Sequence, residues 1–152
     1  MSGTGMLRVG ADQQQLSSFV RKVIKEGKPF TDFDFPANVN SLLDEDNNHG
    51  GLDNHSVKDF KKLQWRRASE IYPLGPQIFK KGVEPEDVKQ GKLADCYLLS
   101  VLSALAEIPG RIEGLFNTTK VNSAGIYSIN FFINGKRTEV IIDDYIPCDP
   151  VS

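Results

Sequence analysis

The segment QGKLADCYLLSVLSALAEIP, residues 90–109, carries a long apolar run in the middle of the chain. From Leu98 onward its leucine, valine and alanine residues fill three turns, which predicts a helix that is apolar on almost every side and therefore buried. Asp95 is placed to cap the first turn, and the Pro-Gly pair at 109–110 ends the helix. The segment thus predicts a central, buried helix that begins at Cys96.

Cys96 falls in the first turn of this helix, where its chemistry depends on its surroundings. Unpaired backbone N–H groups and the positive end of the helix dipole favour an anion there, which for Cys96 is the nucleophilic thiolate. The same N–H groups can hold the oxyanion that forms when a thiolate attacks an amide carbonyl, and Gln90 can add its side-chain amide. A cysteine followed by Tyr97 and two leucines can equally be a small apolar core residue. The residues alone leave both interpretations open.

Composition and charge exclude several classes of function. Of the 152 residues, 39% are hydrophobic and 25% are charged, which is typical of a globular domain. The 18 basic and 20 acidic residues alternate along the chain, so a nucleic-acid surface is not predicted. No apolar run is long enough to span a membrane and no secretory signal is recognisable, so we expect an intracellular, cytoplasmic protein. Two cysteines are too few for a disulfide framework.

Residues 1–29 predict a lead-in followed by a docking helix. Positions 1–15 are polar and rich in Gly and Gln, as chain ends commonly are. Gly27 is placed to end a helix, and the aromatic residues of FTDFDFP after it suit an extended segment on a domain surface. The apolar residues that define one face of this helix are Leu16, Phe19, Val20, Val23 and Ile24.

The polar stretch DEDNNHGGLDNH, residues 44–55, holds both histidines of the chain. Read as a calcium-binding EF-hand loop, it has His49 where a Gly is required and His55 where a bidentate Glu is required. Neither histidine has a second ligand at the spacing of a zinc site. The stretch is therefore interpreted as a solvated loop.

The carboxyl-terminal part changes from helical to strand periodicity. The runs Ile126–Ile133 and Thr138–Ile142 are rich in β-branched and aromatic residues and are joined at Asn134-Gly135, a strong hairpin signal. Before the long helix, Ser56 can cap a short helix and Pro85 can begin a single helical turn. The fold class predicted is α+β, with helices first and an antiparallel β-hairpin packed on the helix of Cys96.

The residues around Cys96 resemble the catalytic cysteine signature of the calpain family, papain-like intracellular cysteine endopeptidases. The pattern is Gln90-Gly91-x-Leu93-x-Asp95-Cys96-aromatic-Leu98-Leu99. The resemblance covers about residues 30–148, because further segments follow the family order on both sides of this pattern. These are FTDFDFP, WRRASEI, Phe79, Gly82, the Gly125-x-Tyr127 strand and VIIDDYIP. The resemblance implies that residues 30–152 form the first half of a papain-like protease core, with Cys96 as the nucleophile and Gln90 as the oxyanion donor.

The resemblance also implies a regulator and includes three departures from the family pattern. No cofactor is needed for the chemistry, but the family binds calcium in this half of the core, which here points to Asp87 and a backbone oxygen near Gly82. Ala94, Tyr97 and Ala68 stand where the family usually has Gly, Trp and Pro. These departures remove no reacting group.

One component of the protease is absent from the sequence. A thiol protease needs an imidazole base, which in papain-like chains lies about 130–150 residues beyond the cysteine. Here 56 residues follow Cys96 (152 minus 96), and both histidines precede it. We therefore expect an incomplete catalytic core that is inactive alone. The face left open would be covered by the histidine-bearing half or by a partner protein.

Three functions remain after this reading. The first is a calpain-type endopeptidase that cuts protein substrates through Cys96 once the histidine half is present. The alternative is a non-catalytic, calpain-like scaffold module in a larger assembly. The third is a redox-sensing thiol, for which Cys148 is the only candidate partner of Cys96.

Overall fold

The computed structural model describes residues 17–43, 54–91, 93 and 95–150. The predicted lead-in at 1–15 and most of the polar loop at 44–55 lie outside these ranges. In chain order the elements are α1 (Ser18–Glu26), η1 (Val39–Ser41), α2 (Asn54–Phe60), β1 (Gln64–Arg67), α3 (Ala68–Ile71), η3 (Pro85–Asp87), α4 (Cys96–Ala106), η4 (Glu113–Leu115), β2 (Ile126–Ile133), β3 (Lys136–Asp143) and β4 (Tyr145–Cys148).

The strands form two separate antiparallel pairs, β2 with β3 and β1 with β4. In the first pair, Ile126 lies opposite Asp143 and Ile133 opposite Lys136. Positive φ angles of 51° at Asn134 and 74° at Gly135 close the turn, which confirms the hairpin predicted from this dipeptide. The pair of β1 with β4 was not predicted.

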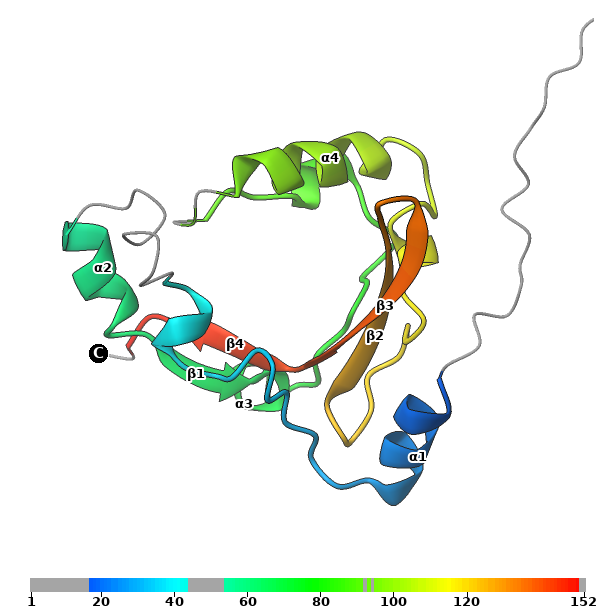
Figure 1. Cartoon of the computed structure of the whole chain (residues 1–152), viewed down its shortest axis with the longest axis horizontal. Helices are drawn as coiled ribbons and strands as arrows, with labels where there is room; N and C mark the ends of the chain where they lie inside the picture. Colours follow the sequence, from blue (N-terminus) through cyan, green and yellow to red (C-terminus); the bar gives the residue numbers. More distant parts are fainter. Residues whose placement is uncertain (1–16, 44–53, 92, 94, 151–152) are drawn as a thin grey trace, which may run out of the picture.

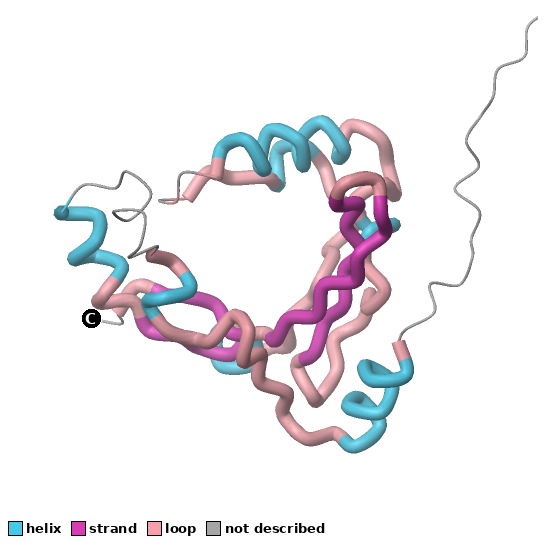
Figure 2. The backbone as a smooth tube through the Cα atoms, in the orientation of Figure 1, coloured by secondary structure: helices cyan, strands magenta, loops and turns pink. Residues whose placement is uncertain are grey.

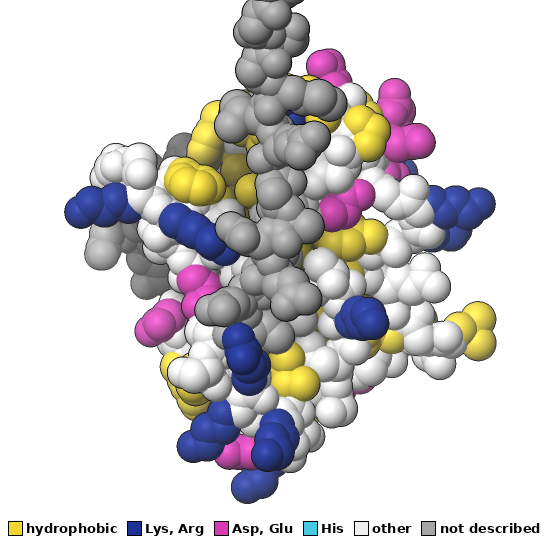
Figure 3. Space-filling view, turned by 90° about the vertical axis from the view of Figure 1, so that its right-hand side faces the viewer, with side chains coloured by type: hydrophobic (Ala, Val, Ile, Leu, Met, Phe, Trp, Pro, Cys, Tyr) yellow, Lys and Arg dark blue, Asp and Glu magenta, His cyan; other side chains and the backbone are white. Residues whose placement is uncertain are grey.

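The helices and strands follow a curved path, and the helix of Cys96 lies on one side of it (Figure 1). In this view α4 runs along the top, the β1–β4 pair lies at the bottom, and the β2–β3 hairpin connects the two sides, with α1 outside the hairpin. Both strand pairs are antiparallel, and helices lie beside them, α3 at β1 and α1 at β2 (Figure 2), so the mixed helix and sheet class is confirmed. The predicted order, with all helices before the strands, is wrong because β1 precedes α3 and α4. On the face in Figure 3, Lys and Arg side chains lie among Asp, Glu and hydrophobic side chains.

Helix α1 docks on the hairpin through a small apolar core. Val20 from α1 packs with Ala124 and Ile126, and all three are 0% exposed. The Ser17 hydroxyl accepts a hydrogen bond from the Val20 N–H at 3.4 Å, and Gly27 ends the helix with φ of 67°. The helix predicted before Gly27 is therefore present, and its apolar face is the side that contacts β2.

We expect Val20→Ala to lower the free energy of unfolding by about 2 kcal/mol, because it removes two buried methyl groups and leaves a cavity. Urea denaturation of both proteins measures the difference. Lys22→Ala on the exposed side of the same helix is the matched control, with an expected change below about 0.5 kcal/mol. Equal effects of the two replacements would show that α1 is not held by its Val20 contact.

A partly buried ion pair connects the first described segment to β1 and to the end of the hairpin. Arg67 donates to the Asp144 carboxylate at 2.5 Å and to the Phe30 carbonyl at 2.6 Å, and its guanidinium lies 4.3 Å from the centre of the Tyr145 ring. The two charged side chains are only 15% and 11% exposed. Burial acts to lower the pKa of Arg67, but the hydrogen bond and charge of Asp144 outweigh it, and the pKa is raised.

The carboxylate of the neighbouring Asp143 also connects the first described segment to the start of β4. Asp143 accepts the Asp32 N–H at 2.8 Å and the Tyr145 N–H at 3.0 Å. Tyr127 lies on the adjacent strand, and its pKa is raised first by burial and then by the charge of Asp144. The two consecutive aspartates of the VIIDDYIP motif therefore act as structural anchors.

Helix α4 begins at Cys96 as predicted, but the prediction that it is buried is wrong. Ala106 is its only buried residue, while 75% of Tyr97 and 55% of Val101 are exposed. A helix that is apolar on every side needs neighbours on several sides. In the described part of the chain α4 packs mainly on η3, and the hairpin is packed by α1. Within the described ranges, no helix has the length and apolarity needed to cross a membrane.

Candidate active site

Cys96 is the first residue of α4, and its side chain is exposed to solvent. The carbonyl of Asp95, at the N-cap position, accepts the N–H groups of Leu98 and Leu99 at 2.9 and 3.1 Å. The thiol therefore stands at the positive end of the helix, where an anion is stabilised. Cys96 is therefore not part of the core formed by the described residues.

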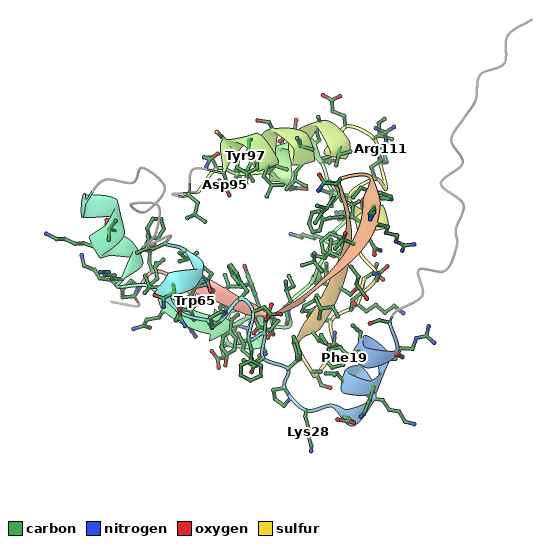
Figure 4. All side chains as sticks on the ribbon, in the orientation of Figure 1. Phe19, Lys28, Trp65, Asp95, Tyr97 and Arg111 are labelled. Atoms are coloured by element: carbon green, nitrogen blue, oxygen red, sulfur yellow. The ribbon has the colours of Figure 1, made fainter. Side chains whose placement is uncertain are left out.

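Gln90 reaches the same end of the helix through its side-chain amide. Its Nε2 donates to the Leu93 carbonyl at 2.6 Å and to Asp95 Oδ1 at 2.9 Å. The structure thus joins Gln90 to the residue immediately before Cys96. Figure 4 shows Asp95 together with Tyr97 at the start of α4, with Trp65 of β1 on the other side of the molecule.

Two described parts of the segment before Cys96 contact other elements. At one end η3 packs against α4. At the other, Leu93 packs on the apolar cluster of Leu43, Val57 and Phe60, which is built around α2. Leu93 therefore contacts the cluster around α2, and η3 contacts the helix of Cys96.

Comparison with known proteins identifies the family. A family model described as "Calpain family cysteine protease" matches residues 30–151. The chain belongs to this calpain family. The match includes the ion pair of Arg67 with Asp144, the loop that begins at Gln90, and Cys96. The family resemblance predicted from the Cys96 signature is therefore confirmed.

Curated calpains are similar to this chain over most of its length. A calpain-type cysteine protease of Arabidopsis thaliana is 37% identical over 127 residues, which is 80% of this chain. Calpain-5 of Caenorhabditis elegans is 34% identical over 84% of the chain, and the calpain-2 catalytic subunit of Homo sapiens is 31% identical over 88%. The chain spans only 6% of the plant protein and 19% of each animal protein.

The calcium ligands implied for the calpain family lie on one loop before α4. Asp87 ends η3, and its Oδ2 accepts the Glu84 N–H at 3.0 Å. Gly82 has φ of 95°, and Glu113 Oε1 lies 3.6 Å from the position of a Cβ at Gly82. Within the described residues, no three side chains of His, Cys, Asp or Glu form a metal-binding group. Asp87 and Gly82 alone fall short of the six to eight oxygen ligands that Ca²⁺ takes.

In the described part of the chain, neither a histidine side chain nor the Cys148 thiol is placed beside Cys96. His49 lies outside the described ranges, and only the backbone of His55, in α2, is described. Cys148 is a free, half-buried thiol at the end of β4, where its Sγ contacts the Ile146 carbonyl at 3.3 Å. Cys96 is also free, so the two cysteines form no disulfide here.

Two pockets lie in another part of this calpain chain. One, of about 380 Å³, opens beside Arg67 and Asp144. The other, of about 280 Å³, is lined by Tyr127 and by residues from the start of β4. The linings of both exclude Gln90 and Cys96, so neither is a substrate cleft at the thiol.

Two features near the predicted site residues were not predicted from the sequence, because they depend on side-chain geometry. Asp95 was interpreted as a helix cap, but its carboxylate bonds to Gln90. Glu113 was not singled out, although its Oε2 is buried and has no hydrogen-bond partner among the described residues. The spacing of five between Gln90 and Asp95 across a Gly-containing loop is the signal that would have indicated the first contact.

Proposed function

We propose that this chain is the cysteine-bearing half of a calpain-type endopeptidase that hydrolyses peptide bonds in protein substrates. The observation that carries the proposal is the exposed Cys96 thiol at the start of α4, with the Gln90 amide bonded to the preceding residue. Membership of a cysteine protease family supports the same chemistry. A solvent-accessible sulfur at a helix N-terminus is one arrangement that favours a nucleophilic cysteine.

The proposed reaction begins with attack by the Cys96 thiolate on the scissile carbonyl carbon. As the S–C bond forms, the π electrons of the carbonyl move to its oxygen, and N–H groups at the start of α4 and of Gln90 stabilise that oxyanion. Collapse expels the amine, which takes a proton from an imidazolium, and water then hydrolyses the thioester. Because no histidine follows Cys96 in this sequence, the imidazole would come from a second half of the core.

The open side of α4 supports a partner of that kind. Tyr97, Leu98 and Val101 expose 75%, 39% and 55% of their surfaces along one helix. A contiguous apolar surface of this sort favours an interface. We propose that the histidine-bearing half covers it, which would complete a papain-like two-half core in which residues 30–152 are the first half. A different partner protein on the same surface is the alternative expected of a scaffold module.

Covalent labelling distinguishes the protease from the scaffold. A peptidyl epoxide probe is incubated with this chain alone and with a polypeptide in which the histidine-bearing half is present. We expect one probe mass on Cys96 only in the second case, with labelling lost in Cys96→Ser and retained in Cys148→Ser. The absence of labelling in both cases would favour the scaffold. Equal labelling in both would indicate ordinary thiol reactivity and would count against a catalytic role.

Calcium binding near Asp87 is the second part of the proposal. Glu113 Oε2 is buried without a hydrogen-bond partner in the described part of the chain, and its Oε1 approaches Gly82. An unpaired buried carboxylate oxygen is costly, and a bound cation would compensate it. Asp87, Glu113 and the Gly82 carbonyl would then supply oxygen ligands from the loop and η4, with the remaining ligands from outside this set.

We expect Glu113→Gln to weaken calcium binding on the order of tenfold, because affinity follows the number of charged ligands. Backbone NMR of this chain during a calcium titration measures it through the Gly82 and Asp87 amides. Glu107→Gln, at the exposed residue just after α4, is the control and should leave the titration unchanged. If millimolar calcium moves neither amide, the metal role of this loop is wrong.

A further inference from the structure

Asp95 occupies the N-cap position of α4 but does not act as a cap. An aspartate at this position ordinarily accepts the backbone N–H of the second or third helical residue. Here the Asp95 side chain makes no capping hydrogen bond, and its Oδ1 instead accepts Gln90 Nε2 at 2.9 Å. Its backbone, with φ of -106° and ψ of 20°, is also outside the extended region typical of a capping residue, so the carboxylate is bonded to the Gln90 amide and not to the first turn of α4.

The contact uses up the donor capacity of Gln90. A glutamine amide carries two hydrogens. One points to the Leu93 carbonyl at 2.6 Å and the other to Asp95 Oδ1 at 2.9 Å. No hydrogen then remains for a third acceptor. An oxyanion stabilised by Gln90 would have to displace one of the two, and Asp95 is the acceptor that resembles it most, since both are negatively charged oxygens.

We propose that Asp95 is a built-in latch, whose carboxylate takes the place of the substrate oxyanion on Gln90 when no substrate is bound. The inference rests on the function proposed above. The latch opens when the Asp95 carboxylate turns from Gln90 to solvent, which leaves the N–H groups at the start of α4 to the oxyanion. Gln90 keeps its bond to the Leu93 carbonyl, which holds the amide in place, and its second N–H is freed for the oxyanion.

The exposure of Gln90 limits how strongly the latch can reduce the rate of hydrolysis. Gln90 is exposed, so water competes for both partners of the contact. A hydrogen bond to a charged acceptor under such exposure lowers the unlatched population by about five- to tenfold. The latch therefore reduces hydrolysis without abolishing it, and its removal should increase the rate.

Replacements that keep a good N-cap residue separate the latch from a structural role. Asp95→Ser and Asp95→Asn both retain a side chain that caps helices well. The serine hydroxyl is too short to reach Gln90, whereas the asparagine oxygen is a neutral and weaker acceptor. In a polypeptide that contains the histidine half, we expect kcat/KM to rise about five- to tenfold in Asp95→Ser, with Asp95→Asn between it and the natural protein. Unchanged or lower rates in both variants would overturn the latch.

A double-mutant cycle tests whether Asp95 acts through Gln90. In a Gln90→Ala background, the same Asp95→Ser replacement should bring no gain in kcat/KM, because the donor that it releases is absent. A gain that persists in this background would show that Asp95 acts on the thiol or on the helix instead. That result would overturn the proposal.

Side-chain NMR tests the latch without any catalysis. In this chain, the two Nε2 protons of Gln90 should differ in chemical shift from those of the exposed Gln77, and Asp95→Ser should move one of them toward the Gln77 value. Identical Gln90 signals in both proteins would overturn the latch. If the natural sequence with its histidine half shows no hydrolysis, the proposed protease function fails, and this comparison still decides whether Asp95 holds Gln90.

Discussion

Cys96→Ala is expected to reduce peptide hydrolysis by on the order of 10⁵- to 10⁶-fold in a polypeptide that contains the histidine half, because no other group forms the thioester. Turnover of a fluorogenic peptide measures the loss. Cys96 is exposed, so its replacement removes no packed side chain. The free energy of unfolding should therefore change by less than about 0.5 kcal/mol, which separates lost chemistry from lost structure.

Cys148→Ala is the matched control for this loss. Its thiol sits at the end of β4 and contacts the Ile146 carbonyl, away from α4. We expect hydrolysis to be retained in this variant. Activity above a tenth of the natural level in Cys96→Ala would contradict the assignment of the nucleophile, whichever result Cys148→Ala gives.

Sequence reasoning succeeded where the signal is local. Asn134-Gly135 favours the left-handed turn that closes the hairpin, and Gly27 ends α1 because it adopts φ of 67°. The start of α4 was found at Cys96 for the same reason, since an aspartate precedes a mostly apolar run. Each of these boundaries depends on the conformational preferences of neighbouring residues.

It failed where distant segments decide the structure. β1 and β4 have four residues each, and the segment that contains α4 and the hairpin separates them in the sequence. They contain two arginines and Pro147, so neither has the alternating pattern of a strand. The burial of α4 was overestimated because an apolar composition says that a surface needs cover and does not say which segment supplies it.

In the candidate site too, local features could be predicted from the sequence and side-chain contacts could not. The sequence placed Gln90 and Cys96 at one end of a helix, and the structure brings Gln90 to the residue before Cys96. The choice of Asp95 between a cap and a partner for Gln90 depends on side-chain torsions that spacing does not determine. Glu113 meets Gly82 from a separate turn of the chain, a contact without any local signature.

Gly125→Ala is expected to lower the free energy of unfolding by about 3–5 kcal/mol, from two separate causes. Gly125 has φ of 59°, a left-handed conformation that costs an alanine about 1–2 kcal/mol. An added Cβ would also lie 2.5 Å from Asp144 Oδ1 and 3.0 Å from Arg67 Nη1. Because that ion pair is mostly shielded from solvent and joins three segments, displacing it adds about 2–3 kcal/mol.

Gly135→Ala separates the two causes. Gly135 has φ of 74°, but a Cβ there meets no atom within 4 Å, so this variant pays the backbone cost alone, about 1–2 kcal/mol. Urea denaturation of both variants gives the difference that belongs to the ion pair. Equal losses of unfolding free energy in the two variants would mean that Arg67 and Asp144 move aside at no cost. The ion pair would then contribute nothing to the stability of the fold around Phe30 and β1.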